Sequence, residues 1–184
     1  MVPIPTAVAD DNEQVLVTRK EWSSAPPISE KEGIPLKYPI PAVIFTYTET
    51  DVCNERKDCK IALNELQRKY KKDGLYDLPW NFVVGGDGTV YEARGWKRQP
   101  EPHPEFPEWA GKSLEIAHFG STVSGVPPND EQMVASWYIV NDGTNKDYIK
   151  PLPIRRTLFY TFPMKITVLK RPIVRHDEGH RFVV

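Results

Sequence analysis

Histidine and cysteine, the residues that most often bind zinc or transfer a proton near neutral pH, are few in this 184-residue chain. Four histidines and two cysteines are present: His103, His118, His176, His180, Cys53 and Cys59. His176 and His180 stand four residues apart, which on a helix would put both imidazoles on one face, as in a zinc pair. The glutamate of an HExxH motif is missing, and Gly179 interrupts the run. We therefore interpret this pair as part of a polar tail, and we assign no metal ion and no cofactor.

Cys53 and Cys59 are separated by six positions, which differs from the CxxC spacing of zinc ribbons and redox motifs. A local disulfide is one interpretation, and two free thiols in a reducing compartment are the other. Sequence separation does not fix the distance between the two Cα atoms that a disulfide requires. Both interpretations stay open on this evidence.

His118 belongs to an alternating segment, SLEIAHFG (113–120), in which it shares one side with Leu114 and Ile116. The pattern predicts a strand, and His118 is expected to be a histidine of the core or of a groove wall. His103 lies instead in a proline-rich segment, residues 100–111, which predicts a loop.

Several further elements would position these side chains. Residues 42–48 are β-branched and aromatic and predict a buried strand, and residues 56–72 carry one apolar stripe at helical spacing. Residues 81–93 read as strand, GGDG turn and strand. Asn129 is expected to cap a second helix that stops at Asn141 to Gly143. The alternation of strands and helices predicts the α/β class: a single domain with a central mixed β-sheet flanked by helices.

Composition excludes several classes of protein. The formal net charge of −1 argues against general nucleic-acid binding, and no stretch approaches the roughly 20 apolar residues of a membrane span.

We divide the chain into an irregular segment 1–14, a domain 15–150 and a basic C-terminal segment 151–184. From residue 146 onward there are nine Lys and Arg against three acidic residues, which suits an acidic partner, anionic lipid or a solvated surface. Pro163 and Pro172 argue against a central strand there, although residues 158–169 alternate like an added edge strand or hairpin.

Specific blocks of sequence resemble the peptidoglycan recognition protein domain, a family related to phage-type zinc amidases. They are RKEW (19–22), VIFTYT (43–48), NFVVGGDGTVYEARGW (81–96), SLEIAHFGS (113–121) and the helix start PPNDEQ (127–132). The resemblance covers about residues 15–150. It implies a disulfide between Cys53 and Cys59 and an extracellular setting or the ectodomain of a membrane protein. Met1 is not followed by a secretory signal, so an intracellular form or a processed chain are the alternatives, and membrane contact would need a segment outside this chain.

The catalytic positions of the family are changed in this sequence. A hydrolytic zinc site uses three protein ligands and keeps one open position for water. The first histidine ligand of the family is replaced by Thr46, and the catalytic tyrosine by Trp80. The last ligands lie in C-terminal His and Cys blocks, but no cysteine follows Cys59. The resemblance therefore implies a member that is not an enzyme. An amidase with an unusual metal set of His103, His118 and His176 is the enzyme alternative.

The groove in which the family binds the peptide stem is also altered. By resemblance, Thr48 and His103 are retained, whereas Tyr70, Trp80 and Ala110 replace other groove residues. A Gly-Trp pair that favours diaminopimelic-acid stems reads Gly74-Leu75 here. Tyr70 and Trp80 are bulky and apolar, so we expect them to fill the groove and to weaken or abolish peptidoglycan binding.

Beside the amidase alternative, the sequence leaves three hypotheses about function. The first is an innate immune receptor ectodomain or modulator that forms homo- or heterodimers with related peptidoglycan recognition proteins. The second is a muropeptide sensor that uses Thr48, Trp80 and His103 in a remodelled groove. The third is a scaffold protein whose basic tail binds an acidic partner.

Overall fold

The computed structural model describes residues 16–26, 28–150 and 168–169. Within these residues, six strands form one sheet in the order β1-β4-β3-β5-β2-β6. β2 and β3 run parallel to the central β5, β1 runs parallel to β4, and the β3–β4 and β2–β6 pairs are antiparallel. The strands are β1 Leu16–Val17, β2 Ala42–Tyr47, β3 Phe82–Val84, β4 Val90–Glu92, β5 Ser113–His118 and β6 Val168–Leu169. The predicted mixed sheet is confirmed.

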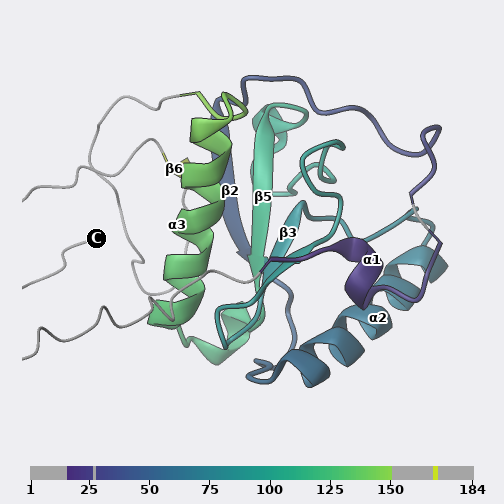
Figure 1. Cartoon of the computed structure of the whole chain (residues 1–184), viewed down its shortest axis with the longest axis vertical. Coiled ribbons are helices and arrows are strands. Elements are labelled where there is room, and N and C mark those ends of the chain that lie inside the picture. The colour runs from purple at the N-terminus through teal and green to yellow at the C-terminus, as the bar shows by residue number, and fades with distance from the viewer. Residues whose placement is uncertain (1–15, 27, 151–167, 170–184) are drawn as a thin grey trace, which may run out of the picture.

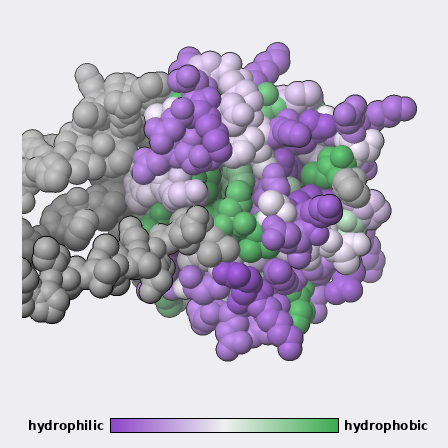
Figure 2. Space-filling model, viewed as in Figure 1, coloured by the Kyte–Doolittle hydropathy of each residue, from purple (hydrophilic) through white to green (hydrophobic). Residues whose placement is uncertain are grey.

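Helices cover both faces of this sheet, and Figure 1 shows α2 and α3 on opposite sides of it. The helices are α1 Arg19–Trp22, α2 Arg56–Lys72 and α3 Asp130–Asn145, with short 3-10 turns η1 Pro107–Trp109 and η2 Thr122–Ser124. The surface in the same view is mostly hydrophilic, with a hydrophobic band beside α3 (Figure 2). None of the helices in the described part of the chain is long and apolar enough to cross a membrane.

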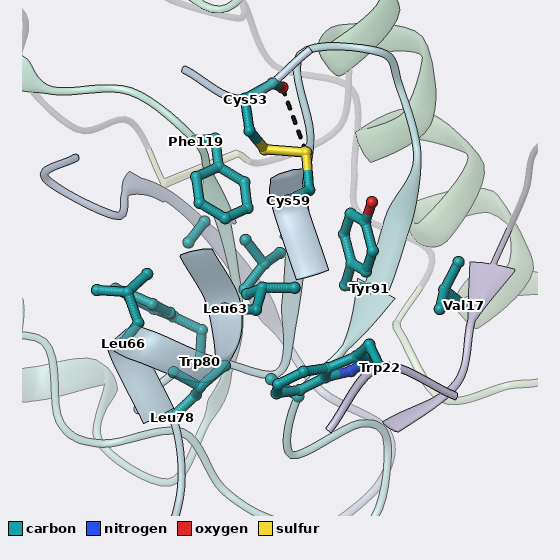
Figure 3. Close-up of a cluster of buried hydrophobic side chains, with 13 residues drawn as sticks. Val17, Trp22, Cys53, Cys59, Leu63, Leu66, Leu78, Trp80, Tyr91 and Phe119 are labelled. Atoms are coloured by element: carbon teal, nitrogen blue, oxygen red, sulfur yellow. Dashed lines mark hydrogen bonds between the residues drawn. A yellow bond between two sulfur atoms is a disulfide. The ribbon is translucent and has the colours of Figure 1, made fainter. Parts of the chain in front are cut away.

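The two-residue period of the strands divides the core into two layers. Leu114 and Ile116 of β5 pack with Ala135 and Ile139 of α3. The alternate residue Ala117 belongs to the second layer, which lies under α2 and is drawn in Figure 3. Its buried members include Cys59, Leu63, Leu66, Trp80, Tyr91 and Phe119.

The helix predicted over residues 56–72 has these bounds in the structure, and the predicted cap of α3 is also present. The Asn129 side chain accepts a hydrogen bond from the Gln132 N–H, at 2.8 Å. The predicted end of α3 at Asn141 to Gly143 is wrong, because the helix continues to Asn145. Gly143 is needed for close packing: a Cβ atom there would lie 2.5 Å from Trp96. The C-terminal half of α3 can therefore approach the Trp96 ring.

Cys53 and Cys59 form a disulfide, with Cα atoms 5.2 Å apart, within the range that such bonds require. The bond joins the segment after β2 to the first turns of α2, beside Phe119 and Tyr91 (Figure 3). Gly86 comes close to the same segment, because its N–H donates to the Cys53 carbonyl at 2.7 Å. The disulfide interpretation is thus confirmed, and the free-thiol alternative is wrong.

We expect the double variant Cys53→Ser/Cys59→Ser to lose about 2 kcal/mol of unfolding free energy, because the bond closes a short loop and restricts the unfolded chain. Urea denaturation of the oxidised wild type and of this variant measures the loss. Reduction of the wild type should give a similar loss. An unchanged denaturation midpoint in both cases would contradict the expectation.

The edge strand β6 pairs with Val43 and Ile44 of β2. An edge position agrees with the β structure expected over residues 158–169, of which the structure describes two. The predicted irregular segment 1–14, most of the basic segment 151–184, and His176 and His180 lie outside the described residues.

Candidate functional site

Four residues define the candidate site on the sheet face opposite α3: Tyr70, Trp80, His103 and Glu115. Side chains along a strand alternate between the two faces, so Glu115 points away from the α3 side, where its neighbours Leu114 and Ile116 lie. In the parallel register Glu115 stands beside Ile44 of β2. Tyr70 comes from the last turns of α2, Trp80 precedes β3, and His103 comes from the loop before η1.

Tyr70 and Trp80 pack edge to face, with ring centroids 5.6 Å apart and an interplanar angle of 87°. Trp80 is only 5% exposed and belongs to the core layer under α2, against which Tyr70 packs while partly buried. The two rings thus pack together in the apolar layer under α2, and their expected role in filling the ligand groove stays a prediction.

Burial raises the pKa of Tyr70, and the carboxylates of Asp73, Glu115 and Glu49 raise this pKa further. All three carboxylates therefore lie close enough to the phenol to act on it electrostatically. The Lys69 ammonium lies 5.9 Å from the centroid of the Tyr70 ring. The Tyr70 hydroxyl is thus within electrostatic reach of three carboxylates, while the last turn of α2 also carries Lys69, Lys71 and Lys72.

His103 lies above Glu115, with its Nε2 atom 3.8 Å from Glu115 Oε1. The side chains are 9% and 4% exposed, so the contact is largely shielded from water. Burial lowers the pKa of His103 and raises the pKa of Glu115 to about 8. Both groups are therefore mainly uncharged at neutral pH, and their contact is not an ion pair under these conditions.

The backbone N–H and carbonyl of Glu115 are both hydrogen-bonded, whereas no described residue donates a hydrogen bond to its carboxylate. Its N–H donates to Asn81 Oδ1 at 2.9 Å, and its carbonyl accepts from the Asn81 N–H at 3.0 Å. Arg94 lowers the pKa of Glu115 electrostatically, but its guanidinium donates elsewhere. The acceptors are the carbonyls of Leu78 and Gln99 and the carboxylate of Glu101. The structure thus holds Glu115 rigidly without pairing its side chain.

The other predicted groove residues are dispersed around this site. Thr48 is buried, and its hydroxyl lies 2.7 Å from the Thr50 hydroxyl. Gly74 has a positive φ of 96° just after α2, and the Leu75 N–H donates to the Tyr70 carbonyl at 3.0 Å, which joins this turn to the site. Ala110 is exposed at the end of η1, and no contact between described residues joins it to Tyr70, Trp80 or His103.

His118 is a core histidine, as one of the two interpretations expected. It is 1% exposed, and its Nε2 atom lies 2.7 Å from the hydroxyl of Ser136 in α3. Complete burial lowers the pKa of His118 to about 4, so the ring is neutral. His103 contacts Glu115, and the Glu115 side chain points to the face of β5 opposite the one that carries His118. The alternative metal set that combined His103 with His118 is therefore wrong, because the sheet separates these two residues. The described residues contain no group of three or more His, Cys, Asp or Glu arranged to hold a metal ion.

Sequence reasoning missed Glu115, although a signal was available. Glutamate is the single charged residue within the segment SLEIAHFG, and alternation puts it on the side opposite His118. A charged residue at a position that a strand buries is uncommon and points to a special role.

Comparison with known proteins places the chain in a family. The model of the family described as N-acetylmuramoyl-L-alanine amidase matches residues 36–181, which continues beyond residue 150 into the C-terminal segment. Mouse peptidoglycan recognition protein 1 is 28% identical over 137 residues, which are 73% of this chain and 71% of that protein. Human peptidoglycan recognition protein 4 is 30% identical over 74% of this chain, but this covers only 35% of its own length.

Solved structures agree with this assignment. The ectodomain of the Drosophila transmembrane receptor PGRP-LCa is 28% identical, with a TM-score of 0.66 over 74% of this chain and 80% of that chain. Wild-type Drosophila PGRP-LB is 26% identical, with a TM-score of 0.67 over 76% and 79% of the two chains. The chain therefore belongs to the N-acetylmuramoyl-L-alanine amidase family, and within it to the peptidoglycan recognition domains.

Proposed function

We propose that this chain is a non-catalytic peptidoglycan recognition domain that acts in innate immunity through association with related recognition proteins. The supporting observation is that Thr46 and Trp80, which occupy two altered catalytic positions, are both buried. Thr46 is a buried strand residue, and Trp80 is packed into the core layer under α2. A threonine hydroxyl is a poor zinc ligand, and an indole N–H does not titrate in the range where acid–base catalysis works.

The packing of Tyr70 against Trp80 supports weak or lost binding of peptidoglycan. The two rings place apolar surface where a polar peptide stem would need hydrogen-bond partners. Each hydrogen bond that a buried polar ligand group loses costs roughly 1–3 kcal/mol. A few such losses are enough to remove micromolar affinity.

Association is the activity that we propose in place of hydrolysis, either between copies of this chain or with a related domain. One structural neighbour is described as tracheal cytotoxin bound to the ectodomain complex of PGRP-LCa and PGRP-LCx; it is 26% identical to this chain. The disulfide favours an oxidising compartment, so we propose an extracellular setting or the ectodomain of a membrane receptor.

Two measurements test this proposal. With added zinc, the full chain should release no peptide from a monomeric muropeptide, while a catalytic relative in the same assay does. In sedimentation velocity, the chain should form a complex with itself or with the PGRP-LCa ectodomain. Released peptide would contradict the non-catalytic role, and the absence of any complex over micromolar concentrations would contradict the role in association.

A muropeptide sensor is the second candidate function, and the state of Glu115 favours it. Burying a carboxylate without a hydrogen-bond donor costs free energy, and a function of that group would explain why the fold tolerates this cost. In a domain whose relatives include human PGRP-IβC, solved with a muramyl pentapeptide, such a group supports a ligand role for the candidate site.

A further inference from the structure

We propose that the solvent-facing side of α2 binds a sulfated polysaccharide through a row of cationic side chains. The row, which we call the basic stripe, consists of Lys57, Lys60, Arg68, Lys71 and Lys72. Four of these residues are exposed and Lys60 is partly buried, and α2 lies on the outside of the molecule, across the sheet from α3 (Figure 1). This surface is separate from the candidate site, so the inference goes beyond the proposed function and can fail independently of it.

Charge is both concentrated and sorted on α2. The helix carries seven Lys and Arg against two acidic residues, although the formal net charge of the whole chain is −1. The two acidic residues, Asp58 and Glu65, are seven positions apart and therefore share one flank of the helix. The residues of the basic stripe recur at intervals of three, four and eleven positions, which bring them together on the other flank. The surface over α2 is accordingly largely hydrophilic in Figure 2.

Within the described part of the chain, no ion pair neutralises the basic stripe. None of the four salt bridges there includes a residue of α2. The Lys71 ammonium donates to the Tyr76 carbonyl at 2.8 Å, which leaves its charge unpaired. Hydrogen bonds from Thr18 lower the pKa of Glu21, and the charge of Lys60 lowers this pKa further, so Lys60 has an acidic neighbour in α1. A polyanion can therefore approach the stripe without displacing an ion pair.

The basic stripe is also linear and fixed in place. Between Lys57 and Lys72 the helix rises about 22 Å. The Cys53–Cys59 disulfide ties the first turns of α2 to the segment after β2, and the Gln67 side chain donates to Asp77 at 2.8 Å. A fixed row of cations suits an extended chain with repeated anionic groups, because the helix does not have to be ordered when the ligand binds.

The surroundings of the stripe favour a sulfated polysaccharide over a membrane or a nucleic acid. The apolar side of α2 is buried in the core, and Ile61, at 50% exposure, is the one exposed large apolar side chain of this helix, so α2 cannot insert into a bilayer. The stripe contains no aromatic ring that could stack on a base, since Tyr70 packs against Trp80. The disulfide favours an oxidising compartment, and clusters of Lys and Arg are typical of heparin-binding surfaces.

The test is fluorescence anisotropy of a labelled heparin dodecasaccharide, titrated with the full chain at several salt concentrations. The wild type should bind, and its affinity should fall as salt rises, because binding releases counterions. Lys57→Gln/Arg68→Gln/Lys72→Gln should bind at least about tenfold more weakly, because three exposed ion pairs are lost. Its salt dependence should also be shallower. Absence of binding by the wild type at about 0.15 M salt would overturn the proposal.

Two control variants remove three cations each from other places: Lys31→Gln/Lys37→Gln/Lys112→Gln and Lys170→Gln/Arg171→Gln/Arg175→Gln. The first set is exposed on other surfaces, and the second belongs to the basic C-terminal segment. Both variants should retain the affinity of the wild type within about threefold. A loss in either control as large as in the α2 variant would assign the binding to net charge or to the C-terminal segment, and would overturn the proposal.

A footprint on the wild type makes the test independent of the folding of any variant. Heparin should protect Lys57 and Lys72 from acetylation and should leave Lys31 and Lys37 reactive. Protection of all four lysines to the same extent would contradict a defined stripe. Vesicles that contain phosphatidylserine and a DNA duplex serve as competing polyanions, and binding of either one as tightly as heparin would overturn the assignment to a sulfated polysaccharide.

Discussion

Glu115→Gln is expected to stabilise the domain by a few kcal/mol at pH 9 and to leave its stability nearly unchanged at pH 4. Burial raises the pKa of Glu115 to about 8 in the folded chain, above its ordinary value of 4.5. The folded state therefore holds a proton that the unfolded state releases between these two values. The contribution of this proton is complete below pH 4.5 and declines as pH rises toward 8. Glutamine is neutral throughout, so the variant avoids the decline.

Thermal denaturation of both proteins at intervals from pH 4 to pH 9 measures this effect. The difference in melting temperature should grow with pH and reach a plateau above pH 8. His103→Ala removes the imidazole that covers the carboxyl and admits water to it, so this variant should show a weaker pH dependence than the wild type. A constant difference between wild type and Glu115→Gln at all pH values would mean that Glu115 is already ionised in the folded protein at neutral pH.

The fold could be predicted from the sequence because its main elements follow simple periods. Alternation in residues 113–120 indicated β5 and correctly separated His118 from the opposite face, and the apolar stripe over 56–72 gave the bounds of α2. The end of α3 could not be predicted in this way. Gly143 looks like a stop signal, but tertiary contact with Trp96 requires a glycine within the helix.

The candidate site was only partly predictable for a different reason. Tyr70, Trp80 and His103 were identified by resemblance to a family, and such reasoning concerns the positions that the family uses. The charge of Glu115 within a buried strand was a local signal, but its contact with His103 emerges only when the register of β5 and the loop around His103 are known, because their combination buries its carboxylate. Long-range contacts of this kind have no local signature in sequence.

Asp77→Ala is expected to lower the free energy of unfolding by about 3–5 kcal/mol, because it leaves a largely buried guanidinium without its partner. Asp77 is fully buried, and Arg19 of α1 donates to its Oδ2 atom from Nε at 2.7 Å. Its Oδ1 atom accepts from the Gln67 side chain at 2.8 Å and from the Leu78 N–H at 2.7 Å. One carboxylate thus joins α1, α2 and the segment before β3, the segment that carries Trp80.

The exposed pair Lys146–Asp142 is the matched control, since its N···O distance is also 2.7 Å. Asp142→Ala should cost only about 0.3–0.5 kcal/mol, because water screens an i,i+4 pair on a helix surface. Adding Arg19→Ala to Asp77→Ala should recover part of the loss, because the unpaired charge is then absent. Urea denaturation of the four proteins measures these differences. Equal losses for Asp77→Ala and Asp142→Ala would show that the buried carboxylate does not hold α1 to the domain, and that the position of Trp80 depends on apolar packing alone.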